Sequence, residues 1–88
     1  MKLTIYGMHK CINCRETIEL FESKEIHYDF IEITDSTTTM KEFLKYRDNE
    51  DLFEEIKREN KIGIPFFIFE DGFKTLDINK AINHLENN

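Results

Sequence analysis

Cys11 and Cys14 are the only cysteines of the 88-residue chain, and they stand three positions apart in the segment His9-Lys10-Cys11-Ile12-Asn13-Cys14. A C-x-x-C pair can bind a metal, close a disulfide or exchange electrons. A tetrahedral metal site needs four ligands, and this pair supplies two. No two of the histidines have a spacing typical of metal ligands; they are His9, His27 and His84. The spacing therefore disfavours a metal site.

The composition limits what the chain can be. Its length predicts one domain over residues 1–88. The net charge of −6 argues against nucleic acid or an anionic membrane as a partner. The apolar run after Lys2 is too short for a secretory signal, and no stretch approaches the roughly 20 apolar residues of a membrane span. We therefore expect a cytoplasmic protein, whose thiols are kept reduced, so a structural disulfide is disfavoured too.

The elements around the cysteines predict a strand–helix–strand unit. Lys2–Tyr6 is a short apolar strand that Gly7 ends, and the C-x-x-C leads directly into a helix. His27–Ile33 is expected to form the second strand, parallel to the first. The inward face of the helix is expected to comprise Cys14, Ile18 and Phe21, backed by Leu20.

The middle of the chain predicts a second helical region. Thr34–Thr38 is a polar loop, and Thr39 with Glu42 fits a capping box, with Thr39 as the N-cap. The helix is expected to end near Asp48-Asn49, after which a further turn or two follows. Its inward residues are Met40, Phe43 and Leu44, and those of the following turns are Leu52, Phe53 and Ile56.

The last third predicts a strand pair and a final helix. Ile62–Phe69 is the most apolar run and is expected to be a buried strand. Asp71-Gly72 predicts a two-residue hairpin, with Phe73–Leu76 returning antiparallel, and Asp77 is expected to cap the last helix. The inward face of that helix is Ile78, Ala81, Ile82 and Leu85. The expected order is β-α-β-α-β-β-α, an α/β fold.

The position of the two cysteines predicts different roles for them. Cys11 falls at the helix start, where unpaired backbone N–H groups and the positive end of the helix dipole favour a thiolate. Lys10 and Arg15 add positive charge nearby. Cys14 lies one turn further on, on the apolar face, and is expected to remain protonated. Cys11 should therefore attack a disulfide and Cys14 should resolve the mixed disulfide.

These residues together resemble the glutaredoxin family. The resemblance rests on the strand ending in C-x-x-C, on Gly63-Ile64-Pro65 opening an apolar strand, and on the Asp71-Gly72 hairpin, and it spans nearly the whole chain. Segments 43–48 and 53–56 look more specifically like short "glutaredoxin-related" proteins of Gram-positive anaerobes. The resemblance implies a thioredoxin-like (glutaredoxin) fold: a four-stranded mixed sheet with helices on both faces. It also implies a cis Ile64–Pro65 bond beside the dithiol, with the Ile64 backbone pairing with substrate.

The chain also departs from the family pattern. Ile12-Asn13 replaces the usual Pro-Tyr between the cysteines, and Lys10 adjoins Cys11 where family members carry a lysine three places earlier. Thr75-Leu76 replaces two glycines of the segment that binds the glutamyl end of glutathione, and of its acidic residues Asp77 remains. We therefore expect weak binding of glutathione, through Cys11, the Ile64 backbone and Lys10.

The expected function is thiol–disulfide oxidoreduction on protein or glutathione mixed disulfides, without a bound cofactor. The electron donor is expected to be glutathione or a thioredoxin-reductase-like enzyme. The alternatives are an iron–sulfur carrier that shares a cluster through Cys11 and glutathione, an arsenate-reductase-like protein, and a non-catalytic regulator. Candidate catalytic residues are Cys11 and Cys14, and candidate substrate-binding residues are Lys10, Ile64, Pro65 and Asp77.

Overall fold

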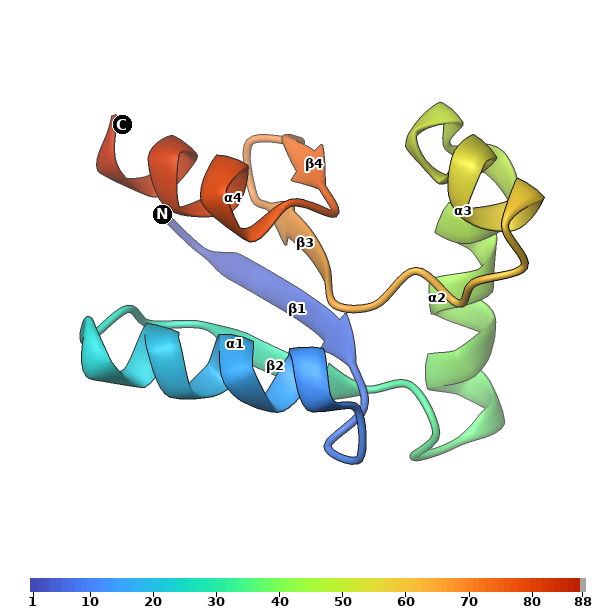
Figure 1. Cartoon of the computed structure of the whole chain (residues 1–88), viewed down its shortest axis with the longest axis horizontal. Helices are drawn as coiled ribbons and strands as arrows, with labels where there is room; N and C mark the ends of the chain where they lie inside the picture. Colours follow the sequence, from blue (N-terminus) through green and yellow to red (C-terminus); the bar gives the residue numbers. More distant parts are fainter. Residues whose placement is uncertain (88) are drawn as a thin grey trace.

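The computed structural model describes residues 1–87, which contain four strands and four α-helices (Figure 1). In order they are β1 (Leu3–Gly7), α1 (Ile12–Ser23), β2 (Asp29–Glu32), α2 (Thr37–Asn49), the 3-10 turn η1 (Asp51–Phe53), α3 (Glu54–Arg58), β3 (Phe66–Phe69), β4 (Lys74–Thr75) and α4 (Ile78–Glu86). Within this described part, no helix combines the length and the apolar character needed to cross a membrane.

The strands form one mixed sheet in the order β2-β1-β3-β4. β1 pairs with β2 in parallel, from Thr4 opposite Asp29 to Gly7 opposite Glu32, as the strand–helix–strand pattern predicts. β1 and β3 are antiparallel, and so are β3 and β4. The α/β class and the mixed four-stranded sheet are thus confirmed.

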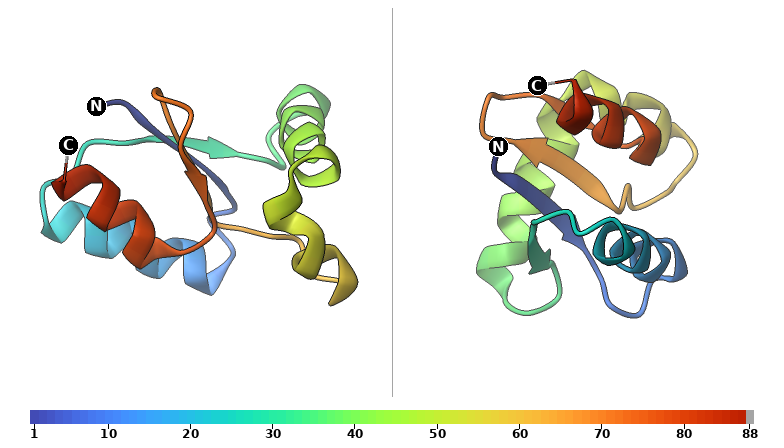
Figure 2. Two further views of the ribbon diagram at one scale, coloured as in Figure 1. Left: turned by 90° about the horizontal axis from the view of Figure 1, so that it is seen from above. Right: turned by 90° about the vertical axis from the view of Figure 1, so that its left-hand side faces the viewer.

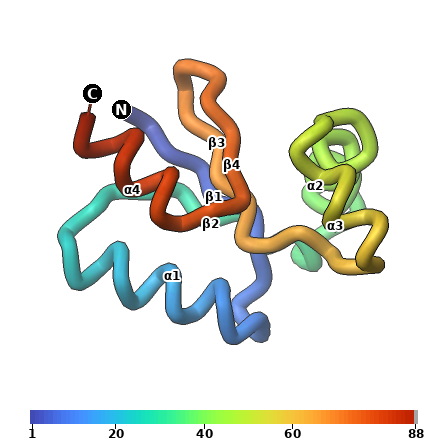
Figure 3. The backbone as a smooth tube through the Cα atoms, turned by 45° about the horizontal axis from the view of Figure 1, so that its top comes forward, coloured from blue at the N-terminus to red at the C-terminus, as the bar shows by residue number. Residues whose placement is uncertain are grey.

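Each face of the sheet is covered by its own pair of helices. α1 and α4 lie on one side, and α2 and α3 lie on the other (Figures 2 and 3). Because successive strand residues point to opposite faces, adjacent residues of β3 enter different cores. The first core contains Leu3, Ile5, Phe21, Phe67, Phe69 and Ala81. The second contains Tyr6, Ile33, Phe43, Phe53 and Phe66.

Two predicted strands are shorter than expected. Of the predicted His27–Ile33 strand, the register with β1 covers Asp29–Glu32. The chain just before it is still bonded to the end of α1, since the Ile26 N–H donates to the Phe21 carbonyl. Only Phe66–Phe69 of the predicted Ile62–Phe69 strand is extended in the sheet. Gly63 has a φ of 95°, incompatible with a strand, so residues 62–65 form a loop.

The start of α2 was predicted at the wrong residue. Ser36, not Thr39, is the N-cap: its backbone is extended, and its side chain accepts the Thr39 N–H at 3.1 Å. Thr39 stands at the third helical position and completes the capping box, because its hydroxyl oxygen accepts the Ser36 N–H at 3.2 Å. The last two residues of the predicted loop, Thr37 and Thr38, therefore belong to the helix. The end of α2 at Asn49 agrees with the prediction.

The β3–β4 hairpin has a longer loop and shorter strand than predicted. Phe67 is opposite Thr75 and Ile68 is opposite Lys74, and the Phe69 N–H donates to the Phe73 carbonyl. The loop therefore comprises residues 70–72, not Asp71-Gly72 alone. Gly72, with a φ of 94°, takes the left-handed position that such three-residue loops require.

The inward face of the last helix follows its sequence pattern, whereas that of the first follows it only in part. In α1 the buried residues are Cys14, Thr17 and Phe21, whereas Ile18 is half-buried and Leu20 is 37% exposed. Thr17 can be buried because its hydroxyl donates to the Asn13 carbonyl at 2.8 Å. In α4 the predicted face packs against the first core, and Asp77 caps the helix as expected.

Candidate active site

Cys11 occupies the N-cap of α1. Its backbone is extended, and its sulfur accepts the Cys14 N–H at 3.4 Å. The loop that delivers it is closed by a hydrogen bond from the Cys11 N–H to the Met8 carbonyl at 3.1 Å. The sulfur thus sits at the positive end of a 12-residue helix, with a partly exposed side chain. A backbone N–H and the positive end of the helix dipole therefore both face this sulfur.

Cys14 is fully buried beneath the same turn. Space for its sulfur exists because residue 7 is a glycine: a Cβ on Gly7 would lie 2.8 Å from Cys14 Sγ and 3.2 Å from the Phe30 ring. The end of β1 therefore accommodates the second thiol directly against the sheet. A larger side chain at this position would have to displace the sulfur or the ring.

The environment of Cys14 favours its neutral form. Burial is the main cause that raises the pKa of its thiol, to about 12, and the neighbouring Cys11 raises it further through a hydrogen bond and through charge. Glu32 contributes in the same direction, whereas a backbone hydrogen bond from Met8 opposes it. Cys14 is thus a buried thiol that resists ionisation, whereas the Cys11 side chain is partly exposed.

A carboxylate at the end of β2 holds the loop before Cys11. Glu32 Oε1 accepts the His9 N–H at 2.8 Å and lies 2.7 Å from His9 Nδ1, while the Thr34 hydroxyl donates to Oε2 at 2.6 Å. Burial alone would raise the pKa of Glu32, but these hydrogen bonds outweigh it and hold the pKa below its ordinary value. The His9 ring also packs on Phe30, with centroids 4.5 Å apart.

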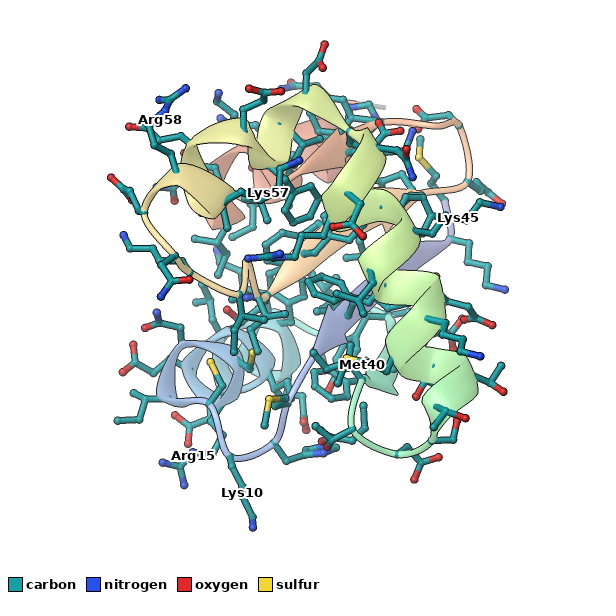
Figure 4. The ribbon with its side chains drawn as sticks, turned by 90° about the vertical axis from the view of Figure 1, so that its right-hand side faces the viewer. Lys10, Arg15, Met40, Lys45, Lys57 and Arg58 are labelled. Carbon is teal, nitrogen blue, oxygen red and sulfur yellow. The ribbon has the colours of Figure 1, made fainter. Side chains whose placement is uncertain are left out.

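A groove of about 580 Å³ runs between the Cys11 loop and the segment that precedes β3. It brings together Cys11, Lys10 and Ile64, three residues that the sequence singles out. The far wall comprises Ile56, Asn60, Lys61, Ile62 and Gly63. Figure 4 shows Lys10 and Arg15 at the same end of the molecule, with their side chains extending away from its body. The charged side chains that line this groove are both lysines.

Neither Pro65 nor Asp77 lines this groove. The Ile64–Pro65 bond is cis, as the family resemblance implies. Pro65 lines an adjoining pocket of about 460 Å³ together with Ile64, Leu76 and Ile78. Asp77 lines neither cavity; its carboxylate accepts the N–H groups of Asn79 and Lys80 at 2.8 and 3.3 Å. In this structure Asp77 acts as a helix cap.

Three residues that shape the site were not identified from the sequence. Gly7 makes room for Cys14, Glu32 anchors the loop before Cys11, and Arg47 binds the segment before Ile64. A glycine placed just before a C-x-x-C loop was a usable indication of close packing. Glu32 and Arg47 had no such local indication, since their partners lie 23 and 15 positions away. Within residues 1–87, no three His, Cys, Asp or Glu side chains lie together in an arrangement that could bind a metal ion.

Comparison with known proteins adds little about this site. No family model matches the chain, and no solved structure matches it. A protein of Haemophilus influenzae described as "Uncharacterized protein" is 33% identical over 55 residues, which are 62% of this chain and 64% of that protein. The chain thus spans slightly less than two thirds of the length of this relative. The case for a function rests on the geometry around Cys11.

Proposed function

We propose that the protein is a glutaredoxin-like thiol–disulfide oxidoreductase with a thioredoxin-like fold, in which Cys11 is the nucleophile and Cys14 the resolving thiol. The observation that carries the proposal is the asymmetry of the dithiol. Cys11 is partly exposed at a helix N-terminus and accepts a backbone N–H, whereas Cys14 is buried with a thiol pKa of about 12. Such a difference assigns attack to the first and resolution to the second.

The first step transfers the substrate sulfur to Cys11. The Cys11 thiolate attacks one sulfur of a disulfide, the S–S bond breaks, and the other sulfur leaves with the electron pair as a thiolate. Two causes that raise the pKa of Cys14, after burial, are its hydrogen bond with Cys11 and the charge of Cys11. Both end when Cys11 enters a mixed disulfide. The pKa of Cys14 therefore falls at the point where Cys14 must act.

In the second step, Cys14 gives its proton to solvent or to the departing thiolate and attacks Cys11 Sγ. The mixed disulfide breaks, the second substrate thiolate leaves, and a Cys11–Cys14 disulfide forms. The substrate has then gained two electrons and the protein has lost two. Glutathione or a thioredoxin-reductase-like flavoprotein is the donor that restores the dithiol.

The groove supports binding of an extended substrate chain at Ile64. Within residues 1–87 the backbone N–H and carbonyl of Ile64 make no hydrogen bond, although Ile64 lines the groove beside Cys11. Free backbone groups of this kind can pair with a peptide in the manner of an added strand. Lys10 adds a positive charge to the same groove. Disulfide-containing protein segments are thus the proposed targets.

Alkylation of single-cysteine variants tests the assignment of roles. Cys14→Ser should keep rapid labelling by iodoacetamide at pH 7, and Cys11→Ser should lose it, as measured by intact mass. Wild-type turnover of a mixed disulfide should be measured with glutathione and, separately, with thioredoxin reductase as the donor. Failure of both donors, or preferential labelling of Cys14, would contradict the proposal. Brown protein with visible absorbance after anaerobic purification would favour an iron–sulfur carrier instead.

A further inference from the structure

Arg47 on α2 donates two hydrogen bonds to the segment that follows α3. Its Nε donates to the Ile62 carbonyl at 2.9 Å, and its Nη2 donates to the Lys61 carbonyl at 2.6 Å. The side chain is half-buried, and within residues 1–87 it forms no ion pair with a carboxylate. The planar guanidinium thus donates hydrogen bonds to two consecutive backbone carbonyls rather than to a carboxylate.

The segment that Arg47 holds is the far wall of the Cys11 groove. Lys61, Ile62, Gly63 and Ile64 all line it, yet none of them belongs to a helix or strand. The segment is tied at its start, where the Lys61 N–H donates to the Ile56 carbonyl at 2.9 Å and closes the end of α3. From Ile62 to Ile64, within the described residues, one backbone group makes a hydrogen bond: the Ile62 carbonyl, which accepts from Arg47 Nε.

We infer that Arg47 is a positioning residue for the substrate groove, which sets the path of the backbone before Ile64 and so the distance of its free N–H and carbonyl groups from Cys11. This inference rests on the proposed function. Under this inference α2 contributes to substrate affinity, although it lies on the opposite face of the sheet from α1. The chemistry at Cys11 itself does not depend on Arg47, because the nucleophile is fixed by its own loop and helix.

The test compares Arg47→Met, Arg47→Lys and Lys57→Met with the wild type. Lys57 is the matched control: its Nζ donates to the Asp48 carbonyl at 3.4 Å, so it also ties α3 to α2, but it does not line the groove. Backbone order parameters are measured by ¹⁵N NMR relaxation over residues 61–69, because within the described residues the Gly63 and Ile64 N–H groups make no hydrogen bond whose loss amide exchange could report. Steady-state KM and kcat are measured with a synthetic peptide carrying a glutathione mixed disulfide, and the alkylation rate of Cys11 with iodoacetamide.

In Arg47→Met, the order parameters of the Gly63 and Ile64 amides should fall from roughly 0.85 to below about 0.6, while those of β3 stay unchanged. KM should rise about tenfold, or about 1.4 kcal/mol. The alkylation rate of Cys11 and kcat should stay within about twofold, a change of roughly 0.4 kcal/mol. Arg47→Lys should recover part of the loss, because an ammonium can donate to one of the two carbonyls at a time. Lys57→Met should change neither the order parameters of Gly63 and Ile64 nor KM.

Two results would overturn the inference. One is order parameters at Gly63 and Ile64 that are no lower in Arg47→Met than in Lys57→Met, whatever the activity. The other is lower order parameters with an unchanged KM, which would show that the position of this backbone does not govern substrate affinity. A wild type that reduces no disulfide would refute the proposed function instead. The comparison of order parameters would then decide by itself whether Arg47 holds the segment.

Discussion

At the scale of single residues, the site depends on a contrast between two side chains of the same type. Cys11 and Cys14 share a sequence motif, but one lies at the mouth of a groove and the other against the sheet at Gly7. Burial separates their chemistry because a thiolate loses more solvation than a thiol when it leaves water. The raised pKa of Cys14 then has a consequence for stability that can be measured without any substrate.

We expect the stability of the protein to fall between pH 9 and about 12 through Cys14. Above 9.0, its ordinary value, the thiol ionises in the unfolded chain, but it stays protonated in the folded protein until its raised pKa of about 12. The folded state then binds more protons than the unfolded state, so the free energy of unfolding decreases as pH rises. Urea unfolding at intervals from pH 8 to 11 should show a steeper fall for wild type than for Cys14→Ala.

The comparison with Cys14→Ala removes the other groups that titrate in this range. Burial also raises the pKa of Tyr6 and of Tyr28, but both tyrosines are present in either protein and contribute equally. Two parallel curves would mean that Cys14 ionises as easily in the folded state as in the unfolded state. The role of resolving thiol would then lose its basis.

At the scale of elements, helix ends place the functional residues. Cys11 is the N-cap of α1, so this helix cap is itself the proposed nucleophile, whereas the carboxylate of Asp77 caps α4. α2 begins at Ser36 and thereby sets the direction of the helix that carries Arg47. The chain there leaves β2 through Ile33, whose N–H donates to the Gly7 carbonyl at 2.9 Å. The choice of cap is therefore connected with the packing of β2 on β1.

Replacement of the α2 cap should destabilise the protein more than replacement of its neighbour. Ser36→Ala removes the acceptor of the Thr39 N–H and should lower the free energy of unfolding by about 1 kcal/mol. Thr38→Ala, at an exposed position inside the helix, should change it by less than about 0.5 kcal/mol. Urea unfolding of both variants gives the comparison. An equal effect of the two would show that Ser36 does not cap the helix.

At the scale of the whole molecule, the groove depends on contact between two layers. Cys11 belongs to the layer of α1 and α4, and the opposite wall comes from the layer of α2 and α3 (Figure 2). Within the second layer, Gly63 packs closely on the helices: a Cβ there would lie 2.7 Å from the Phe53 ring and 3.1 Å from Ile56. Phe53 is fully buried and contacts Phe43 and Phe66 in the second core. The groove wall at Gly63 is therefore packed against the buried ring of Phe53.

Gly63 and Gly72 offer a matched pair for testing this contact. Their φ values are 95° and 94°, so an alanine at either site costs a similar amount in backbone conformation, about 1–3 kcal/mol. Nothing lies within 4 Å of the added Cβ at Gly72, whereas at Gly63 the Cβ overlaps Phe53. Gly63→Ala should therefore be less stable than Gly72→Ala by a further 1–3 kcal/mol or so, the usual cost of overpacking. Equal losses in urea unfolding would show that Gly63 is not packed as described.

The sequence by itself determined the local features of this protein. The apolar runs located the strand cores, the helical periodicity located most inward faces, and Asp77 marked the start of α4. These features depend on neighbours within a few positions, where dihedral preferences and side-chain periodicity act directly. The placement of Cys11 at a helix start belongs to the same class, because a short apolar strand and a helical pattern flank it.

Only the tertiary structure decided the rest. Two hydroxyl residues, Ser36 and Thr39, both suit an N-cap, and the path of the chain out of β2 selected Ser36. The apolar run before Phe66 resembles a strand, but Gly63 packs on Phe53, and residues 62–64 form a wall of the groove instead. Glu32 and Arg47 reach partners far along the chain. Such contacts depend on how the sheet and the helices pack together. The hydrophobic periodicity of one segment does not specify which other segment will pack against it.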